Sequence, residues 1–388
     1  MIGVAALFVS IITGTRPQLI KTAPVLEAIE EAGIRYEFIH TGQHYDYELS
    51  GIFIDGFGLK PPINLDVGSE RYSYQVYTIM KKLSAQFEKS KPDCIIVPGD
   101  TTSALAAGLT GFELEIPVCH LESGLRRYDL RMHEEMNRRL IDHGSSILFA
   151  PTTAAVKNLE REEVQGRIYQ IGDTMYDVLK TRLHRYTDAR FRDEVMDNLG
   201  VTLDQKFTVL TVHRKENVDD KKTLTNIVTA INELDFEVIF PVHPRTRKML
   251  NQFSLDFDKT HVQMCSPLSY DEFMCLVATS SLVISDSGGI QKECYLLNVP
   301  IVSLQTRTEW VETVEAGACA LTKLQPENIV STCQKMFDKK QSNDPSVYGD
   351  GNAARKIPPI LESGDITIPT DRRREPITSY FEERMVVS

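Results

Sequence analysis

Glycine-rich and charged segments follow several short apolar runs, and one of them suggests phosphate binding. Asp286-Ser287-Gly288-Gly289 comes directly after the apolar residues 282–285 and precedes a helical stretch. Two glycines there leave backbone N–H groups uncovered at the positive end of a helix, an arrangement that binds anions. Glu293 lies further along the same predicted helix, where its carboxylate could accept both hydroxyls of a ribose. The sequence therefore predicts a turn that holds the phosphates of a nucleotide.

Three acidic residues in the first half of the chain could exchange protons with a ligand. Asp100 follows the apolar residues 94–97, Glu122 follows residues 117–121, and Glu134 stands where a helix opens. Carboxylates that converge on one site destabilise one another unless they take part in acid–base chemistry. The structural alternatives are an N-cap for Asp100 and a favourable helix-dipole position for Glu134.

Basic residues also follow predicted strands and could neutralise an anion. They are Arg16, Lys21, His213, Arg214 and His243. The alternative for Arg16 and Lys21 is that they are ordinary surface residues that bind no anion. His213 and His243 each come directly after a strand and beside an arginine, which favours function over a core position. The segment around Arg16 is not a G-x-G-x-x-G fingerprint, so a dinucleotide cofactor is not indicated.

The elements that must position these residues are short apolar strands alternating with amphipathic stretches such as residues 19–32 and 72–89. Alternation of this kind predicts α/β architecture with parallel sheets covered by helices on both faces. In such sheets ligands bind at the carboxyl ends of the strands. The predicted strands are residues 7–13, 36–41, 94–97, 117–121, 147–150, 207–212, 238–242, 282–285 and 301–304.

The alternation pauses near Gly172 and Asp173 and then restarts, which predicts two α/β units in tandem. We expect a first domain of residues 1–173, a second, nucleotide-binding domain of residues 174–357, and a C-terminal segment and tail of residues 358–388 that returns to the first domain. Residues 177–200 are predicted to be helical. Residues 352–361 look helical up to Pro358 and Pro359, and an extended tail with a solvated basic cluster at residues 372–374 follows.

Composition excludes several classes of partner. The 388 residues carry a net charge of −11, which argues against nucleic acid and membrane surfaces, both polyanionic. The seven cysteines are scattered and show no metal-site spacing, as in a cytoplasmic protein with reduced thiols. No segment is apolar for long enough to span a bilayer.

The ordered set of motifs resembles the non-hydrolysing UDP-N-acetylglucosamine 2-epimerases over residues 7–361. The resemblance implies two Rossmann-like domains with parallel sheets, of the GT-B type, with a cleft between them. It also implies a UDP-sugar substrate, a homodimer, and neither cofactor nor metal. The motifs are Gly14-Thr15-Arg16-Pro17, Thr41-Gly42-Gln43-His44, Gly99-Asp100-Thr101, His120-Leu121-Glu122-Ser123-Gly124-Leu125-Arg126, Glu134-Glu135-Met136-Asn137-Arg138, His213-Arg214-Lys215-Glu216-Asn217 and Thr308-Glu309-Trp310-Val311-Glu312, with the segment from Asp286 to Glu293.

Roles for single residues follow from the resemblance alone. The catalytic set would be Asp100, Glu122, Glu134 and His213. The substrate contacts would be Arg16, Lys21, Ser287, Gly288, Gly289 and Glu293, with the diphosphate held by Arg16, Lys21 and His213. A second, activating UDP-sugar site would involve Gln43, His44, Arg214 and His243.

The implied reaction is reversible inversion at C2 of UDP-N-acetylglucosamine, giving UDP-N-acetylmannosamine. The hydrogen at C2 is not acidic, because no carbonyl is adjacent in the ring. Anti elimination of UDP would solve this by passing through 2-acetamidoglucal, and syn addition would then return UDP. Two faces of the sugar require two acid–base groups, for which we expect Asp100 and Glu134, with Glu122 orienting or relaying.

The sequence departs from the family pattern at two places, one bearing on the second UDP-sugar site and the other on the identity of the substrate. The loop between Arg126 and Glu134 is shorter than in the best-known members, with His133 in place of a proline, and this weakens the implied second site. Trp310 replaces an arginine and looks like members that act on diacetamido uronic acid nucleotides.

Other functions remain open at this stage. They are a C2 epimerase of a UDP-diacetamido uronic acid sugar, a hydrolysing 2-epimerase, a GT-B glycosyltransferase and a non-catalytic UDP-sugar sensor. The three acids disfavour the last two, and the pattern that begins at His213 favours the non-hydrolysing branch over the hydrolysing one.

Overall fold

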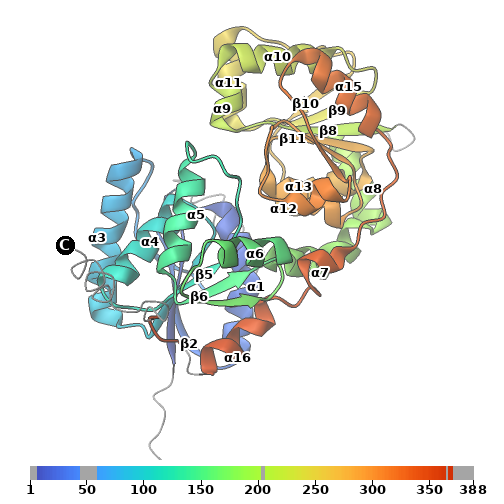
Figure 1. The fold of residues 1–388 in the computed structure, drawn as a ribbon. Helices are drawn as coiled ribbons and strands as arrows, with labels where there is room; N and C mark the ends of the chain where they lie inside the picture. The colour runs from blue at the N-terminus through green and yellow to red at the C-terminus, as the bar shows by residue number, and fades with distance from the viewer. Residues whose placement is uncertain (1–6, 44–58, 202–205, 364–365, 370–388) are drawn as a thin grey trace, which may run out of the picture. The chain divides into compact units, whose positions relative to one another are not determined.

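The computed structural model describes residues 7–43, 59–201, 206–363 and 366–369 (Figure 1). The chain divides into two compact units. Unit 1 comprises Met1–Thr174 together with Asn352–Ser388, and unit 2 comprises Met175–Gly351. Unit 2 is therefore one continuous stretch, whereas unit 1 is assembled from both ends of the sequence.

Unit 1 is built on a seven-stranded parallel sheet in the order β3-β2-β1-β4-β5-β6-β7. The strand order reverses between β1 and β4, the kind of switch point beside which α/β proteins bind ligands. The strands are β1 Phe8–Thr13, β2 Arg35–His40, β3 Ile63–Asn64, β4 Cys94–Pro98, β5 Val118–Leu121, β6 Ile147–Ala150 and β7 Arg167–Gln170.

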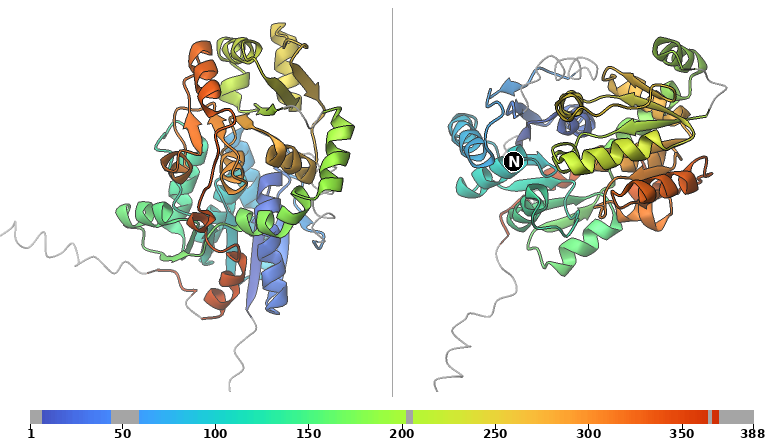
Figure 2. Two further views of the ribbon diagram at one scale, coloured as in Figure 1. Left: turned by 90° about the vertical axis from the view of Figure 1, so that its right-hand side faces the viewer. Right: turned by 90° about the horizontal axis from the view of Figure 1, so that it is seen from above.

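Helices cover both faces of this sheet (Figures 1 and 2). On one face α3 (Tyr72–Ser90), α4 (Thr102–Glu113) and α5 (His133–Gly144) pack side by side over Ile12 and Ile95. On the other face α1 (Arg16–Glu31) packs with η2 (Ala354–Lys356) and α16 (Ile357–Glu362) in a core that includes Ile11 and Ile96. Helix α6 (Thr153–Arg161) packs along β6 and β7.

Unit 2 has a six-stranded parallel sheet in the order β10-β9-β8-β11-β12-β13. The strands are β8 Phe207–Thr211, β9 Glu237–Pro241, β10 Val262–Cys265, β11 Leu282–Ser285, β12 Ile301–Ser303 and β13 Cys319–Leu321. The helices are α7 Thr174–Tyr186, α8 Ala189–Leu199, α9 Lys215–Val218, α10 Lys221–Asn232, α11 Pro244–Phe253, α12 Tyr270–Thr279, α13 Gly288–Leu296, α14 Val311–Glu315 and α15 Pro326–Met336, with η1 Pro345–Tyr348. The prediction of two Rossmann-like units with parallel sheets is confirmed.

All nine predicted strands are present, but four further strands were not predicted. These are β3, β7, β10 and β13, the outermost strands of the two sheets. Edge strands lack a neighbour on one side, and these four carry half-exposed or exposed positions in place of a continuous apolar run.

Two helix predictions need correction. Residues 177–200 form two helices, α7 and α8, because Asp188 caps a new helix by accepting the N–H of Phe191 at 2.9 Å. The stretch 352–361 does not end at its prolines. Pro358 and Pro359 stand in the first turn of α16, where a proline loses no helical hydrogen bond and its fixed φ suits the helix.

Two features of the sequence lie outside the described residues, namely His44 and the basic cluster at residues 372–374. Among the helices that the structure describes, none combines the length and apolar character needed to cross a membrane.

Candidate functional site

In unit 1 the turns after β4 and β5 bring a lysine and two acids together. Lys21 Nζ, on α1, forms an ion pair with Glu122 Oε2. A Cβ added to Gly99 would lie 3.3 Å from Glu122 Oε2 and 3.5 Å from Lys21 Nζ, so the pair lies over the peptide that precedes Asp100. Burial would lower the pKa of Lys21, but the charge of Glu122 and of two nearby aspartates raises it overall. The two aspartates are Asp100 and Asp173.

Glu122 adopts a backbone conformation that is uncommon for its residue type. Its φ is +67°, in the left-handed region that side chains other than glycine rarely occupy. Strain of this kind persists where the surrounding structure determines it, and functional sites are the usual places. Glu122 also lines a small hollow with Asp173 at the carboxyl ends of β5, β6 and β7. Asp173 is 3% exposed and is a fourth carboxylate that the sequence analysis did not place here.

Asp100 is held by its side chain and by its backbone. Its carboxylate forms an ion pair with Arg138 on α5, and its carbonyl accepts the side-chain amide of Asn137 at 2.8 Å. The hydroxyl of Tyr72 donates to Asn137 Oδ1 at 2.5 Å. The capping alternative for Asp100 is wrong, because Thr101 is the N-cap of α4 and accepts the N–H of Ala104.

Glu134 stands in the first turn of α5 on the helix face that approaches Asp100. Residues three and four positions further along a helix share a face with the first, and those positions hold Asn137 and Arg138, the partners of Asp100. The Glu134 side chain is exposed. Burial, followed by the charge of Glu134, raises the pKa of Tyr72, so the carboxylate acts on the same neighbourhood.

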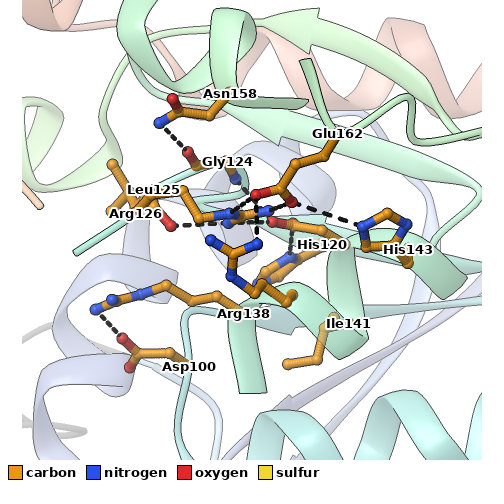
Figure 3. Close-up of polar contacts among 12 residues, drawn as sticks. Asp100, His120, Gly124, Leu125, Arg126, Arg138, Ile141, His143, Asn158 and Glu162 are labelled. Carbon is orange, nitrogen blue, oxygen red and sulfur yellow. Dashed lines mark hydrogen bonds and ion pairs between the residues drawn. The ribbon is translucent and has the colours of Figure 1, made fainter. Parts of the chain in front are cut away.

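A buried charge cluster lies beneath these residues and connects α5, α6 and the β5 turn (Figure 3). Arg126 donates to Asp142 Oδ2 at 2.7 Å and to Glu162 Oε2 at 2.6 Å, and His120 Nδ1 lies 2.6 Å from Asp142 Oδ1. Burial raises the pKa of Asp142, but His120 and Arg126 lower it overall, so the group is a carboxylate. Further ion pairs extend the cluster along α5 to Asp100. They join Glu162 to Arg139, Arg139 and Arg138 to Glu135, and Arg138 to Asp100.

The remaining predicted residues of unit 1 lie at the start of α1 and after β2. Arg16 is the first residue of α1 and is partly buried. Gln43 is buried, and its side-chain oxygen accepts the N–H and hydroxyl of Ser103 at 3.0 and 2.7 Å. These bonds connect the β2 turn to α4. The second UDP-sugar site predicted around Gln43 stays a prediction.

In unit 2 the predicted phosphate turn leads from β11 into α13. Ser287 occupies the N-cap position, but its hydroxyl makes no capping bond, and its N–H donates to Ser285 Oγ at 2.9 Å. A Cβ on Gly288 would lie 2.5 Å from Glu309 Oε1, whereas one on Gly289 would meet nothing closer than 3.8 Å. Gly288 thus allows a close approach of Glu309, and Gly289 has room beside it.

Asp286, the first residue of this turn, connects it to the turn after β8. Its buried carboxylate accepts the backbone N–H of Arg214 at 2.9 Å and the amide of Asn217 at 3.1 Å, and it lies 3.1 Å from His213 Nδ1. Burial raises the pKa of Asp286, but His213 leads the contacts that lower it below its usual range. Asp286 therefore orients His213 and the phosphate turn together.

The basic residues of unit 2 meet beside this turn. The rings of His213 and His243 are 5.7 Å apart between centroids. His243 also caps α11, since its Nδ1 accepts the N–H of Arg245 at 3.1 Å. Arg214 lies 3.5 Å from Glu216. The structure thus gathers the two histidines predicted from their positions after strands.

The helix that follows the turn carries Glu293 among buried partners. The hydroxyl of Tyr270 donates to Glu293 Oε1 at 2.7 Å, and burial together with Glu293 raises the pKa of this tyrosine well above its usual value. Lys292 Nζ lies 4.1 Å from the centroid of the Trp310 ring. Trp310 is only 3% exposed and also packs against Tyr348, so its ring belongs to the interior of unit 2.

Several residues of the two sites were not predicted from sequence. Asp142, Glu162 and Tyr72 lie on helices where nothing marks them as different from surface residues. His120 did carry a signal, because it interrupts a strand that is otherwise buried and apolar, and a polar group there needs hydrogen-bond partners.

Comparisons with known proteins agree with this geometry. The profile of a family described as UDP-N-acetylglucosamine 2-epimerase matches residues 27–362. A Methanococcus maripaludis protein named UDP-N-acetylglucosamine 2-epimerase homolog is 41% identical over 359 residues, covering 91% of this chain and 98% of the relative. A Pseudomonas aeruginosa protein named UDP-2,3-diacetamido-2,3-dideoxy-D-glucuronate 2-epimerase is 37% identical over 358 residues, covering 90% and 98%.

A solved structure agrees as well. The crystal structure of Methanocaldococcus jannaschii UDP-GlcNAc 2-epimerase in complex with UDP-GlcNAc and UDP matches with a TM-score of 0.86 and 36% identity. The match covers 92% of this chain and 100% of that chain. This chain therefore belongs to the UDP-N-acetylglucosamine 2-epimerase family.

Proposed function

We propose that this chain interconverts UDP-N-acetylglucosamine and UDP-N-acetylmannosamine by inverting C2 without net hydrolysis. The observation that carries the proposal is the cluster of Lys21, Glu122 and Asp100, with the face of α5 that bears Glu134 directed toward it. Family membership supports the substrate, because relatives over nearly the whole chain carry this name.

The proposed chemistry begins with departure of UDP from C1. Breaking the C1–O bond builds positive charge on the sugar, which acidifies the hydrogen at C2 and allows a carboxylate to remove it. Asp100 and Glu134 serve the two faces of the resulting 2-acetamidoglucal, and Glu122 orients or relays through its ion pair with Lys21. Return of UDP to C1 and of a proton to the opposite face of C2 completes the inversion.

The leaving diphosphate needs fixed positive charge and N–H donors. His213, Arg16 and Lys21, with the turn of Ser287, Gly288 and Gly289, are the groups we assign to it. Donors that are already oriented stabilise developing charge without reorganising, which is usually the largest contribution to catalysis. Asp286 supplies that orientation for His213 and the turn. Glu293, fixed by Tyr270, binds the ribose.

The substrate test follows the sugar by NMR in D₂O. With UDP-N-acetylglucosamine we expect deuterium at C2 and a mixture of two intact UDP-sugars. Release of free sugar would instead indicate a hydrolysing enzyme, and absence of exchange would overturn the assigned substrate. Glu134→Gln should abolish exchange while UDP binding, measured by calorimetry, stays largely intact; unchanged turnover would refute its role.

The Trp310 ring packs between Lys292 and Tyr348, and its Nε1 would lie 3.4 Å from a Cβ on Gly288. The replacement of arginine by tryptophan therefore changes the packing beside the turn of unit 2.

We also propose a cytoplasmic homodimer. All seven cysteines are free, as suits a reducing compartment. Unit 1 exposes large apolar side chains on α3 and α5, namely Tyr74, Tyr77, Met136 and Leu140, a surface that a second copy would cover. Sedimentation at several concentrations tests this state: a single species of monomer mass would overturn it.

A further inference from the structure

His120 is a fully buried histidine whose two ring nitrogens both face acceptors. Nδ1 lies 2.6 Å from Asp142 Oδ1, and Nε2 lies 2.8 Å from the carbonyl oxygen of Gly99. A carbonyl oxygen can only accept, so Nε2 carries a hydrogen. Asp142 also accepts from Arg126 and from the N–H of Gly124, which marks it as a carboxylate. Nε2 therefore donates to Gly99, and Nδ1 faces a carboxylate that Arg126 and Gly124 also engage.

We propose that His120 is a positioning residue for the epimerisation, and this inference rests on the proposed function. The Nε2–H of its ring holds the Gly99 carbonyl and thereby the backbone from which the Asp100 carboxylate projects. It does not reach the reacting atoms, because its ring is fully buried under the β4 turn.

The same pair of side chains fixes the second acid-bearing turn. Asp142 Oδ2 accepts the N–H of Gly124 at 3.2 Å, two residues after Glu122. The N–H of Gly99 donates to the carbonyl of Leu121 at 2.8 Å, so the two turns are also bonded to each other. His120 and Asp142 thus connect the turn that carries Asp100 to the turn that carries Glu122.

The Gly99 peptide is held between the Lys21–Glu122 ion pair on one side and His120 on the other, and its orientation determines where the Asp100 carboxylate lies. Gly99 has φ of +67°, and the ion pair of Lys21 and Glu122 lies against the side where a Cβ would point. His120 holds its carbonyl from the buried side. Loss of that hydrogen bond would let the peptide rotate and would displace Asp100 relative to the Lys21–Glu122 pair.

Asp142 fixes the His120 ring from the side opposite Gly99. It reaches Nδ1 from α5, and Arg126, which follows β5, forms ion pairs with Asp142 and with Glu162 at the end of α6. In Asp142→Asn the Nε2–H would still hold Gly99, but Nδ1 would lose its charged partner.

Three variants separate positioning from general stability. In His120→Ala the Gly99 carbonyl loses its donor, and we expect kcat to fall about 10²-fold, the size of effect that a displacement of about 1 Å produces. Asp142→Asn should lose about tenfold, because a neutral hydrogen bond is roughly half as strong as a charge-assisted one. His143→Gln is the matched control: His143 belongs to the same helix and lies 3.6 Å from Glu162, but it does not touch Gly99.

The readout is kcat per UDP-binding site, with the number of sites counted by calorimetry. We expect His120→Ala to bind UDP at full stoichiometry with KM little changed and only kcat lowered, and His143→Gln to stay within about twofold of wild type. A loss of UDP-binding sites with kcat per site unchanged would show a merely structural role and would overturn the inference. Equal kcat in His120→Ala and wild type would do the same.

A spectroscopic measurement keeps the inference testable if His120→Ala does not fold. In wild-type protein with ¹⁵N-labelled histidine, we expect the His120 Nε2–H to be hydrogen-bonded to a carbonyl and protected from exchange with solvent, and we expect Asp142→Asn to keep this bond. A His120 ring without a hydrogen on Nε2 would overturn the inference, whereas wild-type protein that shows no exchange at C2 would overturn the proposed function.

Discussion

The carboxyl edges of the two sheets differ in what they present, although both sheets have a Rossmann-like order. After β4 and β5, unit 1 presents charged side chains that are paired with one another, among them Lys21 with Glu122 and Asp100 with Arg138. After β11, unit 2 presents a glycine turn. The buried carboxylate of that turn, Asp286, accepts hydrogen bonds from the neighbouring turn after β8. Proton transfer needs titratable side chains, whereas holding a phosphate needs oriented donors, so one strand order supports both tasks.

The largest effect that separates the two edges should come from Asp100→Asn. An amide cannot exchange the proton, so we expect kcat to fall by about 10²–10⁴-fold, the usual contribution of a general acid or base. UDP binding should change little, because Asp100 pairs with Arg138, whereas His213 and the turn of Ser287, Gly288 and Gly289 belong to unit 2. Steady-state kinetics and calorimetry measure the two quantities, and a matching loss of UDP affinity would contradict the division of labour.

The next effect concerns stability, because the buried carboxylates of the two units have different partners. Asp142→Ala leaves His120 and Arg126 without their shared anion, and we expect a loss of about 3–5 kcal/mol in the free energy of unfolding. Asp286→Ala chiefly leaves backbone and amide donors unpaired, at about 1–3 kcal/mol. Denaturant titration of both variants makes the comparison, and equal losses would contradict it.

Acid should also remove the stabilisation of the folded protein that the Asp142 carboxylate provides. The pKa of this group is lowered in the folded protein, so its stabilisation is present above the unfolded value of about 3.9 and is lost as pH falls through the folded value. Between about pH 4 and pH 2 the wild type should therefore lose stability more steeply than Asp142→Ala. Parallel pH profiles would show that Asp142 is not linked to folding.

A smaller effect is expected at the glycine turn of unit 2. In Gly288→Ala the new Cβ would lie 2.5 Å from Glu309 Oε1, which must move, at about 1–3 kcal/mol. We expect this variant to unfold at a lower denaturant concentration than wild type. Gly289→Ala is the matched control for stability, since its Cβ would meet no atom closer than 3.8 Å. Denaturant titration should separate the two, and equal stabilities would argue against close approach at Gly288.

The smallest effect should follow from Tyr270→Phe. This change removes one hydrogen bond to Glu293, so we expect UDP binding to weaken by about 0.5–1.5 kcal/mol. The binding of inorganic diphosphate, which has no ribose, should not change. A loss shared by both ligands would show that Tyr270 supports the whole unit and not Glu293 in particular.

The central strands of both sheets could be predicted from sequence, and the edge strands could not. A strand with neighbours on both sides and helices on both faces must be apolar throughout, as in Cys94–Pro98. The edge strand Arg167–Gln170 has half-exposed positions, so its residues do not distinguish it from a loop.

Residue types at the sites could be predicted, but their pairing could not. Position after a strand marked Asp100, Glu122 and His213, because the carboxyl ends of parallel strands meet at one edge. The bond from His120 to Gly99 joins residues 21 positions apart, and the choice of Thr101 as the cap depends on one backbone turn. Such contacts depend on tertiary packing, which spacing along the chain does not encode.

The division of unit 1 between two stretches of chain has a consequence for biosynthesis. A ribosome makes α1 early, yet the face of α1 that packs on η2 and α16 finds these partners only after all of unit 2 has been made. Until then the face of α1 that packs on these partners stays uncovered on the nascent chain. Chains released before Ile357 would keep that face exposed, so the packing of unit 1 can be completed only after unit 2 has been synthesised.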